Sequence, residues 1–148
     1  QSCVGGFDDS GKALMYLIGI VYDHNHSKKP GLVHIQEFPG HSSIGVGSYN
    51  ANFWLNYRGQ HLGLGIVQSA YHAYEAKIMA AKAPTVNHST EMIVAIPGKS
   101  FHLTQEKPSA DGCPVSLTEL KKMFKKYGPR NTNALAISPV RLSNAIKS

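Results

Sequence analysis

The stretch ALMYLIGIVY, residues 13–22, decides the fold class of this chain. It is a continuous apolar run rich in residues that favour strands, and it is bounded by Gly11 and by the polar segment 23–31. Such a run predicts a buried strand, and it is much shorter than the roughly 20 residues that a membrane span needs. A second apolar run at residues 32–35 stops before Phe38-Pro39-Gly40, so we expect it to pair with the first strand through the turn between them.

Further along the chain, apolar spacing and turn residues predict the remaining elements. The region 41–58 is rich in Gly, Ser and Asn with interspersed aromatic residues, which indicates an ordered loop pinned by rings. Residues 62–67 resemble a buried strand that contains two glycines. The alanine-rich region 68–83 predicts a helix, with an inner stripe made of Tyr71, Tyr74, Ile78 and Ala81. We expect a hairpin of residues 91–96 and 99–104 around Pro97-Gly98, and a short strand at 134–137.

The clearest local signal is a helix over residues 116–127. Ser116 and Glu119 have the spacing of a capping box, and Gly128-Pro129 ends the helix. Its apolar stripe consists of Leu117, Leu120, Phe124 and Tyr127. Four or five strands with two helices predict an α/β fold, a mixed sheet with two packed helices, in a single domain covering residues 1–148.

Positive charge is concentrated in the last quarter of the chain. Lys and Arg outnumber Asp and Glu by 15 to 9, and the whole excess lies after residue 112, where seven basic residues stand against Glu119 alone. Such a field favours a polyanionic partner, although a solvated helix face is the alternative. We predict that a nucleic acid binds at five of these residues: Lys121, Lys122, Lys125, Lys126 and Arg130.

The cysteines and two sequons suggest a secretory route. Cys3 and Cys113 lack the paired spacing of a zinc site, so one long-range disulfide is the simplest use for them. In the chain-entropy model such a bond contributes roughly 4 to 5 kcal/mol, and it requires an oxidising compartment. Asn25 and Asn87 lie in Asn-x-Ser sequons, and the chain begins at Gln1 without a leader, as a mature secreted form would.

Eight histidines are the most unusual feature after the charge. None has the spacing that specifies zinc, so we predict no metal and no cofactor, and a structural role is the alternative for each histidine. In His26-Ser27-Lys28, an extended backbone would turn the imidazole and the ammonium to the same side. The imidazole would attack phosphorus or protonate the leaving oxygen, while the lysine would offset charge on the phosphate. The tripeptide also lies in a predicted turn, and the alternative interpretation is that this His-x-Lys pattern occurs by chance.

Several segments resemble the deoxyribonuclease II family. They are Gly19 to Asp23, Gly31 to Pro39 with its Leu-Val-His and Phe-Pro signature, Ser48-Tyr49, Gly59 to Leu62, and Lys126-Tyr127-Gly128. The resemblance implies a phospholipase-D-like fold, of which this chain would be one lobe, and a secreted or lysosomal acid endonuclease that needs no metal and uses two His-x-Lys motifs. Here Tyr16-Leu17-Ile18 stands where the first motif is expected, and the chain is less than half the length of a two-lobed member. His34 is the family histidine that matches by position.

Three functions therefore remain open. The first is metal-independent DNA hydrolysis at acidic pH by His26, Lys28 and His34, with a homodimer placing two His-x-Lys motifs across one groove. The second is an inactive relative that binds a polyanion or a host protein. The third is a small secreted ribonuclease, which needs a carboxylate near a histidine, such as Glu37 beside His34 or Glu106 near His102.

Overall fold

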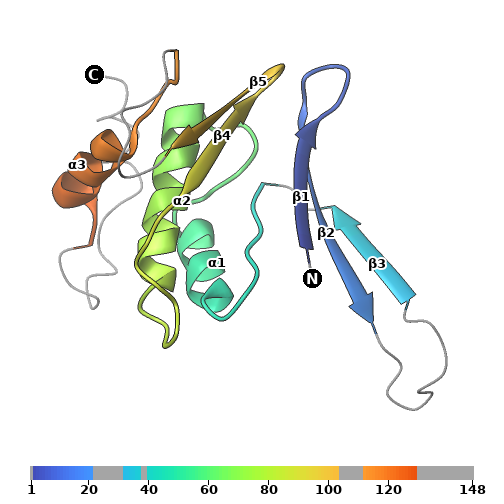
Figure 1. Ribbon diagram of the computed structural model, residues 1–148, viewed down its shortest axis with the longest axis horizontal. Coiled ribbons are helices and arrows are strands. Elements are labelled where there is room, and N and C mark those ends of the chain that lie inside the picture. The colour runs from blue at the N-terminus through green and yellow to red at the C-terminus, as the bar shows by residue number, and fades with distance from the viewer. Residues whose placement is uncertain (1, 22–31, 38–39, 104–111, 130–148) are drawn as a thin grey trace.

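The fold is α/β, with two small antiparallel sheets and three helices (Figure 1). The structure, a computed structural model, describes the whole chain except residues 1, 22–31, 38–39, 104–111 and 130–148. In chain order the elements are β1 Ser2–Phe7, β2 Ala13–Val21, β3 Leu32–Glu37, α1 Ser48–Tyr57, α2 Ile66–Ala80, β4 Met92–Ile96, β5 Lys99–Leu103 and α3 Leu117–Tyr127. The fold class agrees with the prediction. The predicted architecture of one mixed sheet with two helices is wrong, because the described strands form two separate antiparallel sheets and a third helix is present.

The first sheet has the order β1-β2-β3 and is antiparallel throughout. The predicted pairing of residues 13–22 with 32–35 is confirmed, with Ile18 opposite Ile35 and Gly19 opposite His34. Strand β1 was not predicted, because its two glycines hide the strand pattern. Its turn to β2 is held by Asp8, whose Oδ1 accepts hydrogen bonds from the backbone amides of Ser10 and Lys12, both at 2.9 Å.

Helix α1 replaces the loop that we expected over residues 41–58. Its serine and its three asparagines have low helix propensity, but Ala51, Trp54 and Leu55 stand at helical spacing and are buried. They pack against Ala76 and Ala80 of α2 in a core cluster of their own. Tertiary packing therefore decides the conformation of this segment, and single-residue propensity does not.

The strand expected at residues 62–67 is also wrong. Residues 62–64 form a turn, and Gly65, with an extended backbone, is the N-cap residue from which α2 starts at Ile66. The helix predicted over 68–83 is confirmed with shifted ends, and Tyr71, Tyr74 and Ala81 of its predicted inner stripe are buried. The apolar run at residues 62–67 is short enough to form either a strand or the start of a helix, and Gly65 as the N-cap residue favours the helix.

The main core joins α2, the β4-β5 hairpin and α3. The hairpin and the helix over 116–127 are confirmed, including both hydrogen bonds of the capping box between Ser116 and Glu119. The buried members of this core are Ala70, Tyr71, Tyr74, Val94, Phe101, Leu103, Val115, Leu117 and Leu120. No helix in the described part of the chain is long and apolar enough to cross a bilayer.

Candidate functional site

Four lysines project from the outer face of α3. Leu117 and Leu120 on the opposite face are buried, and Tyr74 of α2 packs its ring edge-on against Phe124 with centroids 6.2 Å apart. This packing fixes the helix on α2 and turns its polar side outward. The lysines on that side are all exposed, and they are called the lysine face below: Lys121, Lys122, Lys125 and Lys126.

The carboxylate of α3 does not neutralise this face. Glu119 is the only acidic residue in the helix, and its Oε2 accepts hydrogen bonds from the backbone amide and the hydroxyl of Ser116, both at 2.8 Å. The capping box therefore holds the negative charge at the N-terminal end, where the helix dipole stabilises it. Lys125 and Lys126 lie in the last turn, which favours positive charge.

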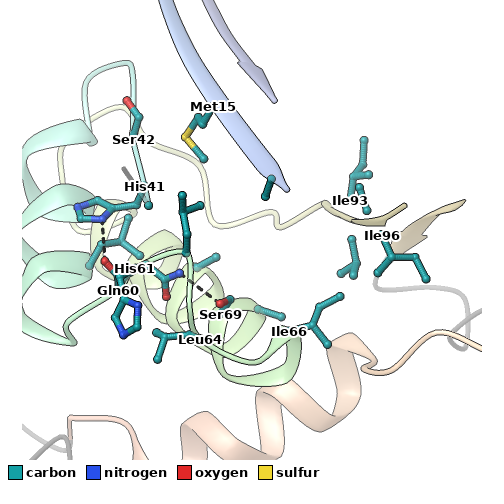
Figure 2. A pocket seen from close by; sticks show the side chains of 18 of the residues that line it. Met15, His41, Ser42, Gln60, His61, Leu64, Ile66, Ser69, Ile93 and Ile96 are labelled. Atoms are coloured by element: carbon teal, nitrogen blue, oxygen red, sulfur yellow. Dashed lines mark hydrogen bonds between the residues drawn. The ribbon is translucent and has the colours of Figure 1, made fainter. Parts of the chain in front are cut away.

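A separate open groove of about 510 Å³ lies between the first sheet and the rest of the molecule (Figure 2). Phe7 and Met15 of the first sheet line one part of it, and strand β4 lines another. His41, Gln60 and His61 gather at one end of the groove, while Ile93 and Ile96 lie at the other (Figure 2). Two histidines therefore reach one cavity, but they are not the histidines that sequence reasoning assigned to catalysis.

Gln60 organises the histidine end of the groove. Its side chain bonds the ring Nδ1 of buried His72 through Oε1 at 2.9 Å and donates from Nε2 to the hydroxyl of Ser69 at 3.2 Å. Its backbone oxygen lies 3.3 Å from Nδ1 of His41. Burial, followed by the charges of Arg58 and His61, lowers the pKa of His72 to about 4. His72 is therefore a neutral imidazole near pH 7 that positions Gln60.

Glycine is required where the two loops of this end meet. Gly40 has a φ of 142°, and a Cβ at this position would lie 2.9 Å from the Cα of His61. Any side chain would therefore push the segment that carries His41 away from the segment that carries Gln60 and His61. The convergence of His41 and His61 depends on this close approach.

A buried ion pair lies behind the groove, between the end of α1 and the middle of α2. Arg58 donates from Nε and Nη2 to the two carboxylate oxygens of Glu75, each at 2.6 Å. Burial alone would lower the pKa of Arg58, but hydrogen bonding and the charge of Glu75 raise it above its usual value. The guanidinium also lies 5.8 Å from the ring centroid of Trp54. Both charges are almost fully buried, so the pair clamps α1 to α2.

The lysine face and the groove do not share a surface. Figure 1 shows α3 and the first sheet on opposite sides of α2. On α2 the groove touches Ile66, Ser69 and Ala73, whereas α3 packs at Tyr74. A polyanion on the lysine face is therefore not delivered to His41 and His61 by the same contact.

Most residues predicted to carry catalysis lie outside the described chain. These are His26 and Lys28. Three residues predicted for other roles also lie outside it: the sequon Asn25, the nucleic-acid-binding Arg130 and Glu106, a carboxylate offered for the ribonuclease alternative. The backbone of His34 lies in β3 opposite Gly19, while its side chain is outside the described part. The strand expected at 134–137 also lies outside it.

The other predicted residues are described. Cys3 is exposed, Cys113 is half-buried, and both are free thiols, so the expected disulfide is not formed in the structure. The Sγ of Cys113 instead lies 3.0 Å from the backbone oxygen of Val115. Asn87 is exposed, as a glycosylation acceptor must be, and Glu37 is exposed on β3. At the surface, Nε2 of His102 lies 3.8 Å from Oε2 of Glu91.

Sequence reasoning missed the buried polar network. Arg58 and Glu75 lie in segments that showed no motif, and Gln60 attracted attention only within the resemblance. The available signal was weak: Arg58 is the one arginine among the first 129 residues, and Glu75 interrupts an alanine-rich helix. Neither observation predicts that the two side chains meet.

Comparison of the chain with protein-family models, with curated protein sequences and with solved structures finds no match. In the described residues, no group of three or more His, Cys, Asp or Glu side chains is arranged to hold a metal ion. Evidence for function therefore lies in the geometry of the lysine face and of the groove.

Proposed function

We propose that this protein binds nucleic acid through the lysine face of α3. The observation that carries the proposal is the exposure of Lys121, Lys122, Lys125 and Lys126 together on a helix whose other side is anchored in the core. Residues four apart on a helix lie about 6 Å apart along its axis, so the lysines form two pairs, each spanning about one turn. Such an array suits the repeated charges of a phosphate backbone.

A rigid support favours binding over simple solvation. The capping box and the contacts of Leu117 and Leu120 order the helix before any partner arrives. Only the lysine side chains then lose freedom on binding, which keeps the entropic cost low. The recognition is electrostatic, so we expect little dependence on base sequence and a strong dependence on salt.

Salt dependence of DNA affinity tests the proposal. The protein is titrated into a fluorescein-labelled 20-base-pair duplex, and binding is followed by anisotropy at NaCl concentrations from about 50 to about 200 mM. Over this range, salt strongly weakens binding that depends on phosphate contacts. If all four lysines contact phosphates, the slope of log K against log salt is about −3.6. Lys122→Gln with Lys126→Gln should reduce the slope by about 2 and weaken binding to every sequence alike.

The matched control removes the same charge elsewhere. Lys12 and Lys82 are both exposed and lie outside α3, so the pair Lys12→Gln and Lys82→Gln changes the net charge equally. We expect this variant to retain most of the affinity and the slope. Equal losses in the two variants would show that net charge alone attracts the DNA, and the proposal would be wrong.

Cleavage of the bound strand stays a prediction from the sequence. It is carried by His26, Lys28 and His34, whose side chains lie outside what the structure describes. Binding and cleavage are therefore tested separately.

A further inference from the structure

The groove runs along an open edge of strand β4. All five residues of β4, from Met92 to Ile96, line it. Successive side chains of a strand point to opposite faces of its sheet, so a cavity that touches every residue in turn must follow the strand's edge. The other edge of β4 is paired with β5, in a sheet of these two strands.

The register of the hairpin identifies the backbone groups at this edge. Pro97 and Gly98 form a two-residue turn, with Gly98 at a φ of 73°, and Ile96 pairs with Lys99 across it. A two-residue turn is closed by a hydrogen-bonded pair, and such pairs alternate along an antiparallel ladder. Val94 and Met92 therefore bond to β5, while the N–H and C=O groups of Ile93 and Ala95 point to the groove. In the described chain no other strand pairs with this edge.

The side chains around the edge complete a site for an extended peptide. Phe7 and Met15 form an apolar wall across from β4, and Ile93 is 69% exposed. At the far end His41, Gln60 and His61 offer polar groups (Figure 2). Among the described residues, no acidic side chain lines the groove, and His41 and His61 are the only lining side chains that can carry a positive charge. An occupant with apolar residues at alternate positions and a carboxylate toward the histidines complements this lining.

We propose that the groove binds an extended, acidic peptide segment of a partner protein, added as a strand to the edge of β4. Backbone hydrogen bonds to Ile93 and Ala95 would supply affinity, and the apolar wall would select alternate side chains. An open edge is a template for such pairing, and β4 carries no proline or charged residue that would block it. The site is independent of the lysine face, which lies on a different side of α2.

A designed peptide tests the proposal. The probe is a labelled heptapeptide, Glu-Thr-Val-Thr-Val-Thr-Glu, with blocked ends, followed by anisotropy and by amide chemical shifts of the protein. We expect binding with the largest shifts at Ile93 and Ala95. N-methylation of alternate peptide amides should weaken binding at least about 10-fold, because it removes the donors that a strand needs. Replacing both glutamates by lysine should also weaken it.

Protein variants supply the matched comparison. Ala95→Pro removes one edge N–H and should abolish peptide binding, while Ala95→Ser retains that N–H and should bind normally. The N-methylated peptide tests the same hydrogen bonds without any change to the protein, so a misfolded proline variant does not decide the result. Failure of the probe to bind, equal binding of the N-methylated peptide, or dimerisation that the peptide does not displace would overturn the proposal. DNA binding by the lysine face should be unchanged throughout.

Discussion

Arg58 and Glu75 form a two-point ion pair in the interior, although they stand 17 positions apart in the chain. Their side chains are 1% and 0% exposed, and the contact joins the C-terminal end of α1 to the middle of α2. Tyr71 extends the cluster, with its hydroxyl 3.4 Å from the Oε1 of Glu75. The pair therefore fixes the packing of α1 against α2 beside the histidine end of the groove.

Removing one partner of this pair should be strongly destabilising. Glu75→Gln keeps the shape of the side chain but leaves the Arg58 charge buried without compensation, which we expect to cost about 3 to 5 kcal/mol of unfolding free energy. Urea denaturation followed by circular dichroism measures the loss. The double variant Arg58→Met with Glu75→Leu removes both charges and should lose clearly less. A single variant as stable as the parent would mean that solvent reaches the pair.

Stability should fall as the pH is lowered from about 6.5 to 4. The pKa of His72 is lowered from 6.5 to about 4 in the folded chain, so the unfolded chain binds more protons in this window. Protons therefore favour unfolding, and linkage gives a loss of about 3 kcal/mol by pH 4. Denaturant titrations at several pH values measure this slope. Other groups titrate in the same range, so the His72→Gln variant serves as the reference. An equal slope in the parent and in His72→Gln would contradict the assignment.

The cap of α3 should contribute measurably to stability. Ser116→Ala removes the acceptor for the Glu119 amide, a hydrogen bond of 3.2 Å, and should cost about 1 kcal/mol. Ser116→Thr retains the hydroxyl and should lose little. Thermal unfolding measures both. We expect DNA affinity to change by less than about 2-fold, because Leu117 and Leu120 still hold the helix on the core. A large loss of affinity with Ser116→Ala would show that the lysine face depends on the cap.

The elements that the sequence predicted correctly carry their signals locally. Helix α3 has its cap, its apolar stripe and its terminating glycine within a few residues. The β4-β5 hairpin has Pro97-Gly98 between an apolar run and a segment in which Phe101 and Leu103 alternate with polar residues. Strand β2 is a continuous apolar segment, β3 begins with Leu32-Val33, and polar residues separate the two strands. In each case short-range chemistry and the final packing agree, so a single segment is sufficient for the prediction.

The elements that failed depend on partners elsewhere in the chain. Helix α1 forms because Trp54 and Leu55 find Ala76 and Ala80, and its own composition favours a loop. The groove likewise combines the first sheet, the loops around Gly40 and Gln60, and strand β4. No spacing in the sequence indicates that these segments meet, so the groove could not be predicted. The lysine face could be predicted because all of its residues lie in one helix.

Metal-independent cleavage of DNA tests the residues that the sequence assigns to catalysis. Supercoiled plasmid incubated near pH 5 with a chelator should be nicked, because a histidine acid must be protonated and no metal takes part. His26→Ala, Lys28→Ala and His34→Ala should each abolish nicking. His88→Ala is the matched control, since His88 is an exposed loop histidine with no assigned role, and this variant should retain full activity.

Folding and DNA binding must be measured beside cleavage in that assay. At pH 5 the unfolded chain is protonated at His72 and the folded chain largely is not, so we expect a loss of about 2 kcal/mol of stability. Circular dichroism must therefore show that each variant is folded under assay conditions. DNA binding is measured on the same samples. A variant that binds but does not cleave has lost chemistry, whereas loss of both points to folding. Intact plasmid that nevertheless shifts on a gel, with the shift weakened in the double variant Lys122→Gln with Lys126→Gln, would contradict hydrolysis and leave binding by the lysine face as the function.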